Sequence, residues 1–139
     1  MADDVLINKV AIVERCLMRI DEEYAGDINN LKINFTKQDS IILNLERACE
    51  ASIDIAMRLV RKYNLGIPQE SREAFDLLFK AGKIDEALGH NLKSMVGFRN
   101  VAVHDYQAVN LDVVASILTH HLSDLKKWAQ LALQEARER

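Results

Sequence analysis

Two residues that commonly interrupt helices are scarce in this sequence, which has one proline and five glycines among its 139 residues. Both are unfavourable inside a helix, so their scarcity permits long, uninterrupted helices. The hydrophobic content of 49% is enough to bury one continuous core. We therefore expect an all-α protein with a single domain over residues 1–139, because the length leaves no room for a second domain.

The sequence also lacks the features of secreted and membrane-spanning proteins. No apolar stretch approaches the roughly 20 residues that cross a bilayer. The acidic start, with Asp3 and Asp4, has neither the basic residues nor the apolar run of a secretory signal. The two cysteines, Cys16 and Cys49, are far apart and are expected to be buried thiols in a reducing compartment. These absences predict a cytoplasmic protein with no membrane contact.

Basic residues are not in excess, since 18 Lys and Arg face 21 Asp and Glu and the formal net charge is -3. Proteins that bind nucleic acids usually carry a basic surface, so the overall charge argues against RNA as a partner. An RNA site would have to be a local patch, for example one in which two subunits double a few basic residues across a cleft. Lys80, Lys83 and Lys93 are candidates for the rim of such a patch.

Apolar residues recur at alternating steps of four and three, the spacing that places them on one face of a helix. The first stripe predicts a helix of about 20 residues and consists of Leu6, Val10, Val13, Leu17, Ile20 and Tyr24. The second stripe, which ends near a glycine and a proline, consists of Ile42, Leu45, Cys49, Ile53, Ala56, Val60 and Tyr63. Residues 21–37 are predicted to be a connection, and Thr36 with Asp39 resembles a capping box that opens the second helix.

Three further helices are predicted in the second half of the chain. A short helix centres on Phe75, and a fourth helix begins near Ile84 and carries an apolar stripe that runs up to Arg99. The last helix follows Asn110, a suitable N-cap, and places Trp128 on its buried face. The pattern as a whole favours an up-down helical bundle of about five helices.

Residues that can carry chemistry are concentrated in one segment, residues 98–106, which reads Phe-Arg-Asn-Val-Ala-Val-His-Asp-Tyr. Arg99 offers a permanent positive charge and a planar fork for phosphate oxygens. His104 can exchange a proton near neutral pH. Cleavage of an RNA strand needs both a proton-transfer group and a cation. A base must take the 2′-hydroxyl proton, and a cation must stabilise the charge that builds on the phosphorus oxygens.

Helix geometry restricts how these side chains can meet. Residues five apart on a regular helix point about 140° away from each other and lie about 7.5 Å apart along the axis. Arg99 and His104 therefore converge only if the helix ends between them or if a two-fold related subunit supplies the other half of the site. Asn100 shares a face with His104, where its amide can orient the imidazole or bind phosphate. Tyr106 would return to the side of Arg99 if the backbone stayed helical.

A purely structural interpretation of the same residues is also open. Arg99 can pair with a surface carboxylate, His104 can cap the end of the helix, and Tyr106 can simply pack against its neighbours. Composition and spacing alone favour this interpretation over a catalytic one.

The segment from Arg99 to Tyr106 resembles the signature of HEPN-domain proteins, in which an arginine and a polar residue precede a histidine by a few positions. It is similar in particular to the HepT-like branch, whose pattern is an arginine, four intervening residues, a histidine, any residue and a tyrosine. The resemblance extends to the order of helices along the chain. It implies a metal-independent endoribonuclease that needs no cofactor and acts as a two-fold homodimer. In that scheme His104 acts as general acid or base, Arg99 stabilises the phosphorane, and Asn100 supports them in one cleft shared by both subunits.

The resemblance also implies a biological setting. HepT-like proteins are toxins of type VII bacterial toxin-antitoxin systems, which cleave cellular RNA, and their antitoxin is a minimal nucleotidyltransferase (MNT). That antitoxin transfers AMP from ATP to the motif tyrosine, which corresponds to Tyr106. An attached AMP brings bulk and negative charge to the place where the RNA phosphate must bind, so the modified site should repel its substrate.

Two other functions remain open: a non-catalytic HEPN module that docks a nucleotidyltransferase or binds nucleotide, and a helical scaffold with no site at all. A metal site is not expected, because the adjacent residues His120 and His121 would point about 100° apart on a helix. His121 lies on the apolar stripe of the last helix and is expected to be a hydrogen-bonded core or dimer-contact residue.

Overall fold

The computed structural model describes residues 2–137. Within this range the chain has seven α-helices, one short 3₁₀ turn and no strand, which confirms the all-α prediction. The elements are α1 Asp4–Tyr24, α2 Ile28–Lys32, α3 Phe35–Lys62, α4 Ser71–Lys80, α5 Glu86–His104, η1 Tyr106–Ala108, α6 Leu111–His120 and α7 Leu122–Arg137. None of the helices in these residues combines the length and the apolar character needed to cross a membrane.

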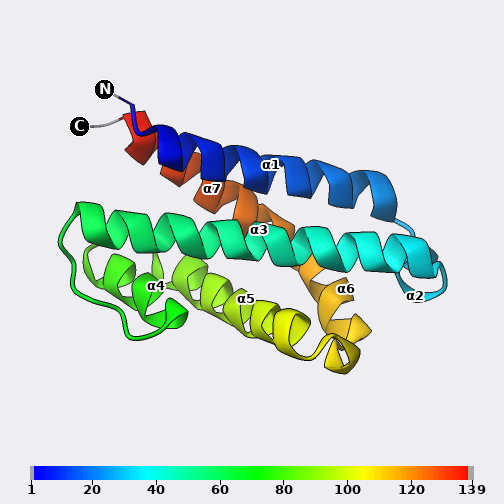
Figure 1. The fold of residues 1–139 in the computed structure, drawn as a ribbon. Coiled ribbons are helices and arrows are strands. Elements are labelled where there is room, and N and C mark those ends of the chain that lie inside the picture. Colours follow the sequence, from blue (N-terminus) through cyan, green and yellow to red (C-terminus); the bar gives the residue numbers. More distant parts are fainter. Residues whose placement is uncertain (1, 138–139) are drawn as a thin grey trace.

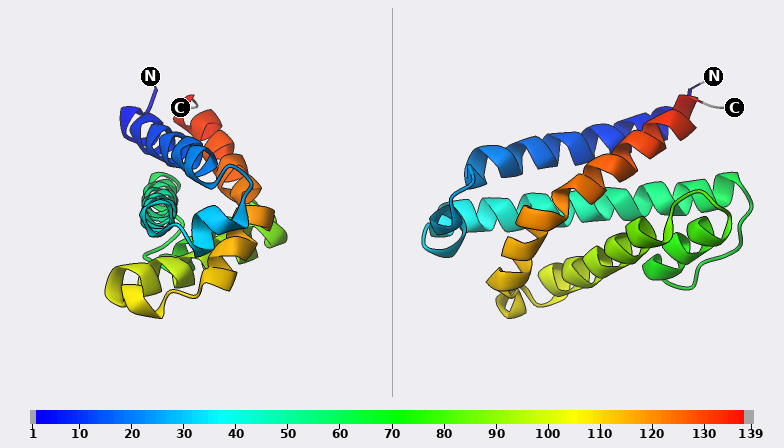
Figure 2. Two further views of the ribbon diagram at one scale, coloured as in Figure 1. Left: turned by 90° about the vertical axis from the view of Figure 1, so that its right-hand side faces the viewer. Right: turned by 180° about the vertical axis from the view of Figure 1, so that it is seen from behind.

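The helices are arranged in layers on two sides of α3 (Figure 1). On one side, α1 runs along α3 in the opposite direction, and α7 lies beside α1 so that the start of α1 and the end of α7 come together. The backbone N–H of Asp3 donates to the carbonyl oxygen of Ala136 at 2.8 Å, which joins these two ends. On the other side, α4 and α5 pack against α3, and α6 crosses from the end of α5 back to α7 (Figure 2).

The core lies between α3 and the helices on both of its sides, and it contains the predicted stripes. Leu6, Val13 and Ile20 of α1 are fully buried against α3. Trp128 of α7 is also buried, as predicted. Its Nε1 donates to the backbone carbonyl oxygen of Ser52 at 3.1 Å, and its ring meets the Phe75 ring edge to face with centroids 5.9 Å apart. Trp128 is therefore a core residue that joins α7 to α3 and α4.

The second long helix begins earlier than the predicted capping box. Asn34 is its N-cap, because the Asn34 side chain accepts a hydrogen bond from the backbone N–H of Lys37 at 3.1 Å. Thr36 and Asp39 therefore lie inside α3, and the capping-box prediction is wrong. The carboxylate of Asp39 is left available for a contact outside its own helix. The predicted connection before α3 also contains the short helix α2, which is capped by Asp27.

The last predicted helix is in fact two helices that meet at His121. Asn110 caps the first of them, α6, as predicted. The backbone of His121 then leaves the helical conformation, with φ -125° and ψ -2°, and α7 begins at the next residue. The Nδ1 atom of His121 lies 3.0 Å from Oδ2 of Asp124, so His121 is hydrogen-bonded at a bend. The apolar spacing continues through this bend, which is why periodicity alone does not reveal it.

Candidate functional site

The segment that carries Arg99, Asn100 and His104 is the last part of α5, which remains helical through His104. The first of the two alternatives for convergence, a helix that ends between Arg99 and His104, is therefore wrong. On a continuous helix the two side chains point about 140° apart. A site that uses both residues on one substrate therefore has to receive one of them from a second copy of the chain.

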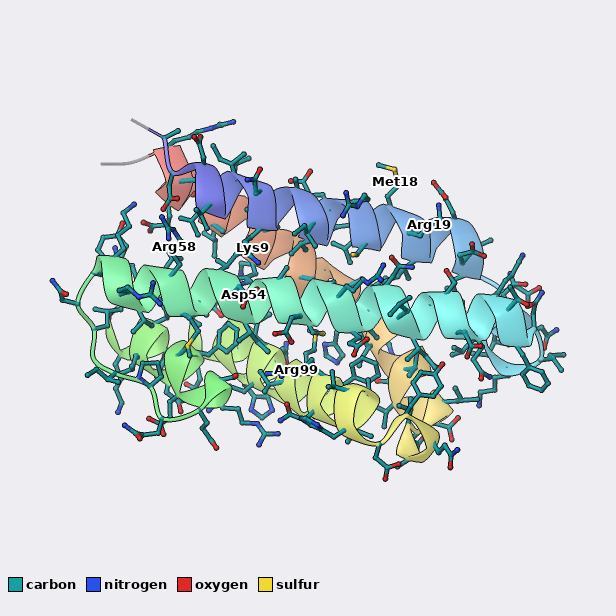
Figure 3. The ribbon with its side chains drawn as sticks, viewed as in Figure 1. Lys9, Met18, Arg19, Asp54, Arg58 and Arg99 are labelled. Atoms are coloured by element: carbon teal, nitrogen blue, oxygen red, sulfur yellow. The ribbon has the colours of Figure 1, made fainter. Side chains whose placement is uncertain are left out.

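Arg99 is held on the α3 side of α5, where Figure 3 shows it between the two helices. Its side chain is only 16% exposed. One guanidinium nitrogen, Nη2, donates to the Oγ atom of Ser71 at 3.1 Å. The first residue of α4 therefore fixes the position of this nitrogen. The Arg99 guanidinium is thereby oriented by groups that are distant in sequence.

Glu50 of α3 supplies a charge contact to the same guanidinium. Its Oε2 lies 3.3 Å from Nε of Arg99. The N–H of Nε is nevertheless buried without a hydrogen-bond partner, because it is not aligned with that oxygen. Glu50 therefore acts on Arg99 through charge, whereas Ser71 acts through a hydrogen bond. The structural interpretation predicted that Arg99 pairs with a carboxylate, and this one contact is confirmed.

A second arginine, Arg72 of α4, lies against α5 at Gly97, two residues before Arg99 in the sequence. A Cβ atom added at Gly97 would stand 2.8 Å from Nη2 of Arg72, so the absence of a side chain at Gly97 allows the Arg72 guanidinium to lie against the helix. The Nε atom of Arg72 donates to the carbonyl oxygen of Lys93 at 3.4 Å. Arg72 follows Ser71 directly, so the start of α4 fixes Arg99 through Ser71 and also brings the Arg72 cation against α5 at Gly97. The mid-helix glycine was the sequence signal for this close approach.

His104 and Asn100 are open to a substrate. His104 is exposed in the last turn of α5, and Asn100 is half-buried one turn earlier on the same face. Within residues 2–137, neither side chain is engaged in a hydrogen bond or an ion pair. Asn100 is therefore available to bind phosphate and His104 to transfer a proton, and the direct contact in which Asn100 orients the imidazole is not formed.

Tyr106 lies outside the helix, in the 3₁₀ turn η1. The backbone of Asp105, with φ -153°, ends α5, so the helical path on which Tyr106 would return to the side of Arg99 is not followed. From η1, Tyr106 contacts α3, where its hydroxyl donates to Oδ1 of Asp39 at 2.6 Å. Partial burial of the phenol, this hydrogen bond and the negative charges of Asp39 and Glu46 raise the pKa of Tyr106 to about 12. The phenol therefore carries its proton at neutral pH.

Of the three lysines expected to form a basic rim, Lys80 is exposed at the end of α4, whereas Lys83 and Lys93 have partners of their own. Lys93 pairs with Asp76 at 2.7 Å. Lys83 lies 3.8 Å from the centre of the Tyr63 ring and 3.9 Å from a carboxylate oxygen of Glu135, which belongs to α7. These contacts engage both side chains within the chain. Arg72 is therefore a stronger candidate for phosphate binding than either of these lysines.

The remaining histidines and the cysteines do not form a second reactive centre. Residues 2–137 contain no group of three or more His, Cys, Asp or Glu side chains that could hold a metal ion. Cys16 and Cys49 are buried free thiols, as predicted. Burial raises the pKa of Cys49 to about 12, which makes this thiol unreactive. The chemistry of the chain is therefore concentrated at the end of α5 and in η1.

Sequence comparison identifies related proteins over almost the full length. The family model described as Ribonuclease HepT-like matches residues 13–132. A protein of Shewanella oneidensis named mRNA nuclease HepT is 50% identical over 133 residues, which cover 96% of this chain and 99% of that protein. The similarity therefore extends far beyond the short motif at residues 99–106.

Solved structures are similar in fold as well as in sequence. The tri-AMPylated Shewanella oneidensis HEPN toxin in complex with MNT antitoxin gives a TM-score of 0.85 and 51% identity, over 92% of this chain and 96% of that chain. A crystal structure of a toxin-antitoxin with AMP-PNP gives a TM-score of 0.86 and 50% identity, over 92% and 96% of the two chains. At this level of agreement, the similarity covers both the arrangement of the helices and the residues that build them.

Proposed function

The chain belongs to the HepT-like ribonuclease family, and we propose that it is an endoribonuclease toxin with an active site built around Arg99 and His104. The observation that carries the proposal is the 50% identity to an mRNA nuclease over nearly all of both proteins. The end of α5 adds the two groups that RNA cleavage needs, a cation and a proton-transfer group. In this proposal residues 1–139 form one HepT-like domain that acts on cellular RNA in the cytoplasm.

The proposed reaction uses the substrate's own 2′-hydroxyl as the nucleophile. Its oxygen attacks the adjacent phosphorus, and the 5′-oxygen of the next nucleotide leaves. His104 takes the 2′-hydroxyl proton or protonates the leaving oxygen, and Arg99 stabilises the negative charge on the phosphorane oxygens. Asn100, on the same face as His104, supports them by binding the phosphate. None of these steps requires a metal ion.

A homodimer completes this site. Within one chain Arg99 and His104 diverge, so a two-fold related copy would supply the complementary residue. The second copy would also double the positive charge in the cleft, which a chain with a net charge of -3 otherwise lacks. Val101 and Val103, which lie between Arg99 and His104 on α5, are 38% and 48% exposed, and they offer an apolar surface for the second copy to cover.

The proposed antitoxin is a nucleotidyltransferase that silences the toxin by transferring AMP to Tyr106, as in type VII toxin-antitoxin systems. The related Shewanella oneidensis toxin is described as tri-AMPylated and in complex with MNT antitoxin. Tyr106 is 44% exposed and lies two residues after His104, so an AMP group on its oxygen would stand near the proton-transfer residue. Its phosphate would repel the RNA backbone.

Cleavage of total RNA in the presence of EDTA tests this proposal. Wild-type protein without AMP on Tyr106 is compared with Arg99→Ala and His104→Ala. Two matched controls replace an arginine and a histidine outside the motif. They are Arg19→Ala, on α1 (Figure 3), and His120→Ala, at the end of α6. Only the first two variants should lose cleavage, by a factor of about 100 or more, because each removes a group that acts in the transition state.

The same experiment distinguishes the nuclease from the non-catalytic alternative. If unmodified, dimeric wild-type protein leaves RNA intact, the chain is a HEPN module that docks a nucleotidyltransferase or binds nucleotide. If the control variants lose as much activity as Arg99→Ala and His104→Ala, the assignment of the site is wrong even though the protein is a nuclease.

A further inference from the structure

The hydroxyl group of Tyr106 has a carboxylate as its hydrogen-bond acceptor. Asp39 of α3 and Tyr106 of η1 are 67 residues apart in sequence, yet their side-chain oxygens are 2.6 Å apart. Tyr106 is the partner of Asp39 in this structure, and both side chains lie at the surface. An enzyme that acts on the Tyr106 oxygen from solvent would therefore meet Asp39 in the same position.

A role in stability explains this contact poorly. A hydrogen bond between two exposed side chains contributes little to folding, because water competes for both partners. The Asp39 carboxylate is also free of the capping role predicted for it, because Asn34 caps α3. The contact instead fixes which way the phenol oxygen points and gives its proton an acceptor.

Transfer of a group to a phenol oxygen requires that the phenol lose its proton. At neutral pH Tyr106 keeps its proton, since partial burial and the neighbouring carboxylates raise its pKa to about 12. A neutral phenol is a weak nucleophile unless a base takes the proton as the new bond forms. Asp39 is the base within hydrogen-bond reach of that proton.

We propose that Asp39 is the general base for adenylylation of Tyr106, so that the toxin itself supplies a catalytic group for its own silencing. The inference rests on the proposed function, in which Tyr106 is the AMP acceptor. The Tyr106 oxygen forms a bond to the α-phosphorus of ATP, and the bond from that phosphorus to the bridging oxygen of the β-phosphate breaks. Pyrophosphate leaves with the electron pair of that bond, and the phenol proton passes to the Asp39 carboxylate.

The charged groups that act on the Tyr106 phenol come from α3. Asp39 contacts it, and Glu46 adds a negative charge without contact. The other titratable residues close to Tyr106 in sequence are His104 and Asp105, two and one positions before it. Glu46 therefore provides a matched control: Glu46→Gln removes one nearby negative charge, as Asp39→Asn does, but it leaves the proton acceptor in place.

The experiment measures the rate at which the MNT antitoxin of Shewanella oneidensis, with Mg²⁺ and ATP, adenylylates the purified toxin, followed by intact mass. Wild type, Asp39→Asn, Glu46→Gln and Tyr106→Phe are compared at saturating antitoxin, so that docking does not limit the rate. Asparagine keeps the size and the hydrogen-bond acceptor of Asp39 but cannot take a proton at neutral pH. We expect Asp39→Asn to react about 100-fold more slowly than wild type, and Glu46→Gln within about three-fold of it.

The pH profile separates a base from a structural contact. The defect of Asp39→Asn should shrink as pH rises, because hydroxide replaces the missing base and the phenol ionises by itself. A positioning role predicts instead a defect that is the same at every pH. Thermal melting of Asp39→Asn at the wild-type temperature would show that the variant is folded.

Each outcome bears on a separate claim. Wild-type rates for Asp39→Asn, or an equal loss for Asp39→Asn and Glu46→Gln, would overturn the role of Asp39 while Tyr106 remains the acceptor. Unchanged modification of Tyr106→Phe, or no modification of wild type, would overturn the proposed silencing at Tyr106 and the role of Asp39 with it. RNA cleavage by the unmodified wild type tests the nuclease independently of all four rates.

Discussion

Replacement of Glu50 by glutamine should impair cleavage more than it impairs folding. The Glu50 oxygen and Nε of Arg99 are 3.3 Å apart. Two unit charges at that separation interact by about 1 kcal/mol in water and about 5 kcal/mol at an effective dielectric constant of 20. The Glu50 side chain is 50% exposed, so solvent screening keeps the lower figure. We therefore expect Glu50→Gln to lower the free energy of unfolding by no more than about 1 kcal/mol.

The effect on catalysis should be larger because it depends on where the guanidinium stands. If residue 50 carried no charge, the guanidinium of Arg99 would be held only by the hydrogen bond from its Nη2 atom to Ser71. A displacement of about 1 Å in a catalytic group can cost about 100-fold in rate, and the remaining Ser71 contact limits the displacement. We expect Glu50→Gln to lower kcat/KM for RNA cleavage by about 10-fold, mainly through kcat, and the double variant with Ser71→Ala to lose more.

The assay is cleavage of a fluorescent RNA at several substrate concentrations, with urea unfolding of the same samples. Glu46→Gln, one turn earlier on α3, is the control and should cleave as wild type does. Faster cleavage or a lower KM for Glu50→Gln would refute the reasoning, because it would show that Glu50 competes with the RNA phosphate for Arg99. An unchanged rate would show that Ser71 alone positions the guanidinium.

Three further predictions follow from other contacts. Gly97→Ala should displace the Arg72 side chain from α5, since the added Cβ would stand 2.8 Å from the Nη2 atom of Arg72. It should therefore raise KM for RNA by the same few-fold factor as Arg72→Ala. Different KM values for the two variants would contradict this. Trp128→Ala should lower the free energy of unfolding by about 3–5 kcal/mol in urea titrations, because it empties a buried site between three helices, and a loss below about 1 kcal/mol would contradict its core role. Arg58, chiefly through its hydrogen bond, holds the pKa of Asp3 below the ordinary value of 3.8, so this pair stabilises the fold above about pH 4 and its contribution is lost as pH falls further. Asp3→Asn, which can still cap α1, should therefore lower the melting temperature at neutral pH but not in strong acid; an equal loss at both pH values would point to the cap instead.

The parts of the fold that follow from local spacing were predictable. The stripes of α1 and α3, the N-cap at Asn110 and the burial of Trp128 each depend on residues close in sequence, which periodicity and capping rules describe. The bend at His121 was missed because the apolar spacing continues through it. The early start of α3 was missed because Asn34, a good N-cap, stands just ahead of the apparent capping box.

The candidate site was predictable in its residue types and incomplete in its surroundings. The motif from Arg99 to Tyr106 could be found because its members are adjacent in sequence. Their partners could not, because Ser71 and Asp39 reach the motif only through packing of α4 and α3 against α5 and η1. Helix geometry nevertheless allowed one firm deduction from sequence, namely that Arg99 and His104 cannot meet within one continuous helix.

The central claim, a ribonuclease site shared by two copies of the chain, is tested most directly by mixing Arg99→Ala with His104→Ala after subunit exchange and measuring RNA cleavage in EDTA. A heterodimer of the two inactive variants retains one intact Arg99 and one intact His104, on different chains. The account predicts that the mixture cleaves RNA at a rate well above the sum of the two variants measured alone. A mixture in which native mass spectrometry detects heterodimers, yet which cleaves no faster than its components, would contradict it.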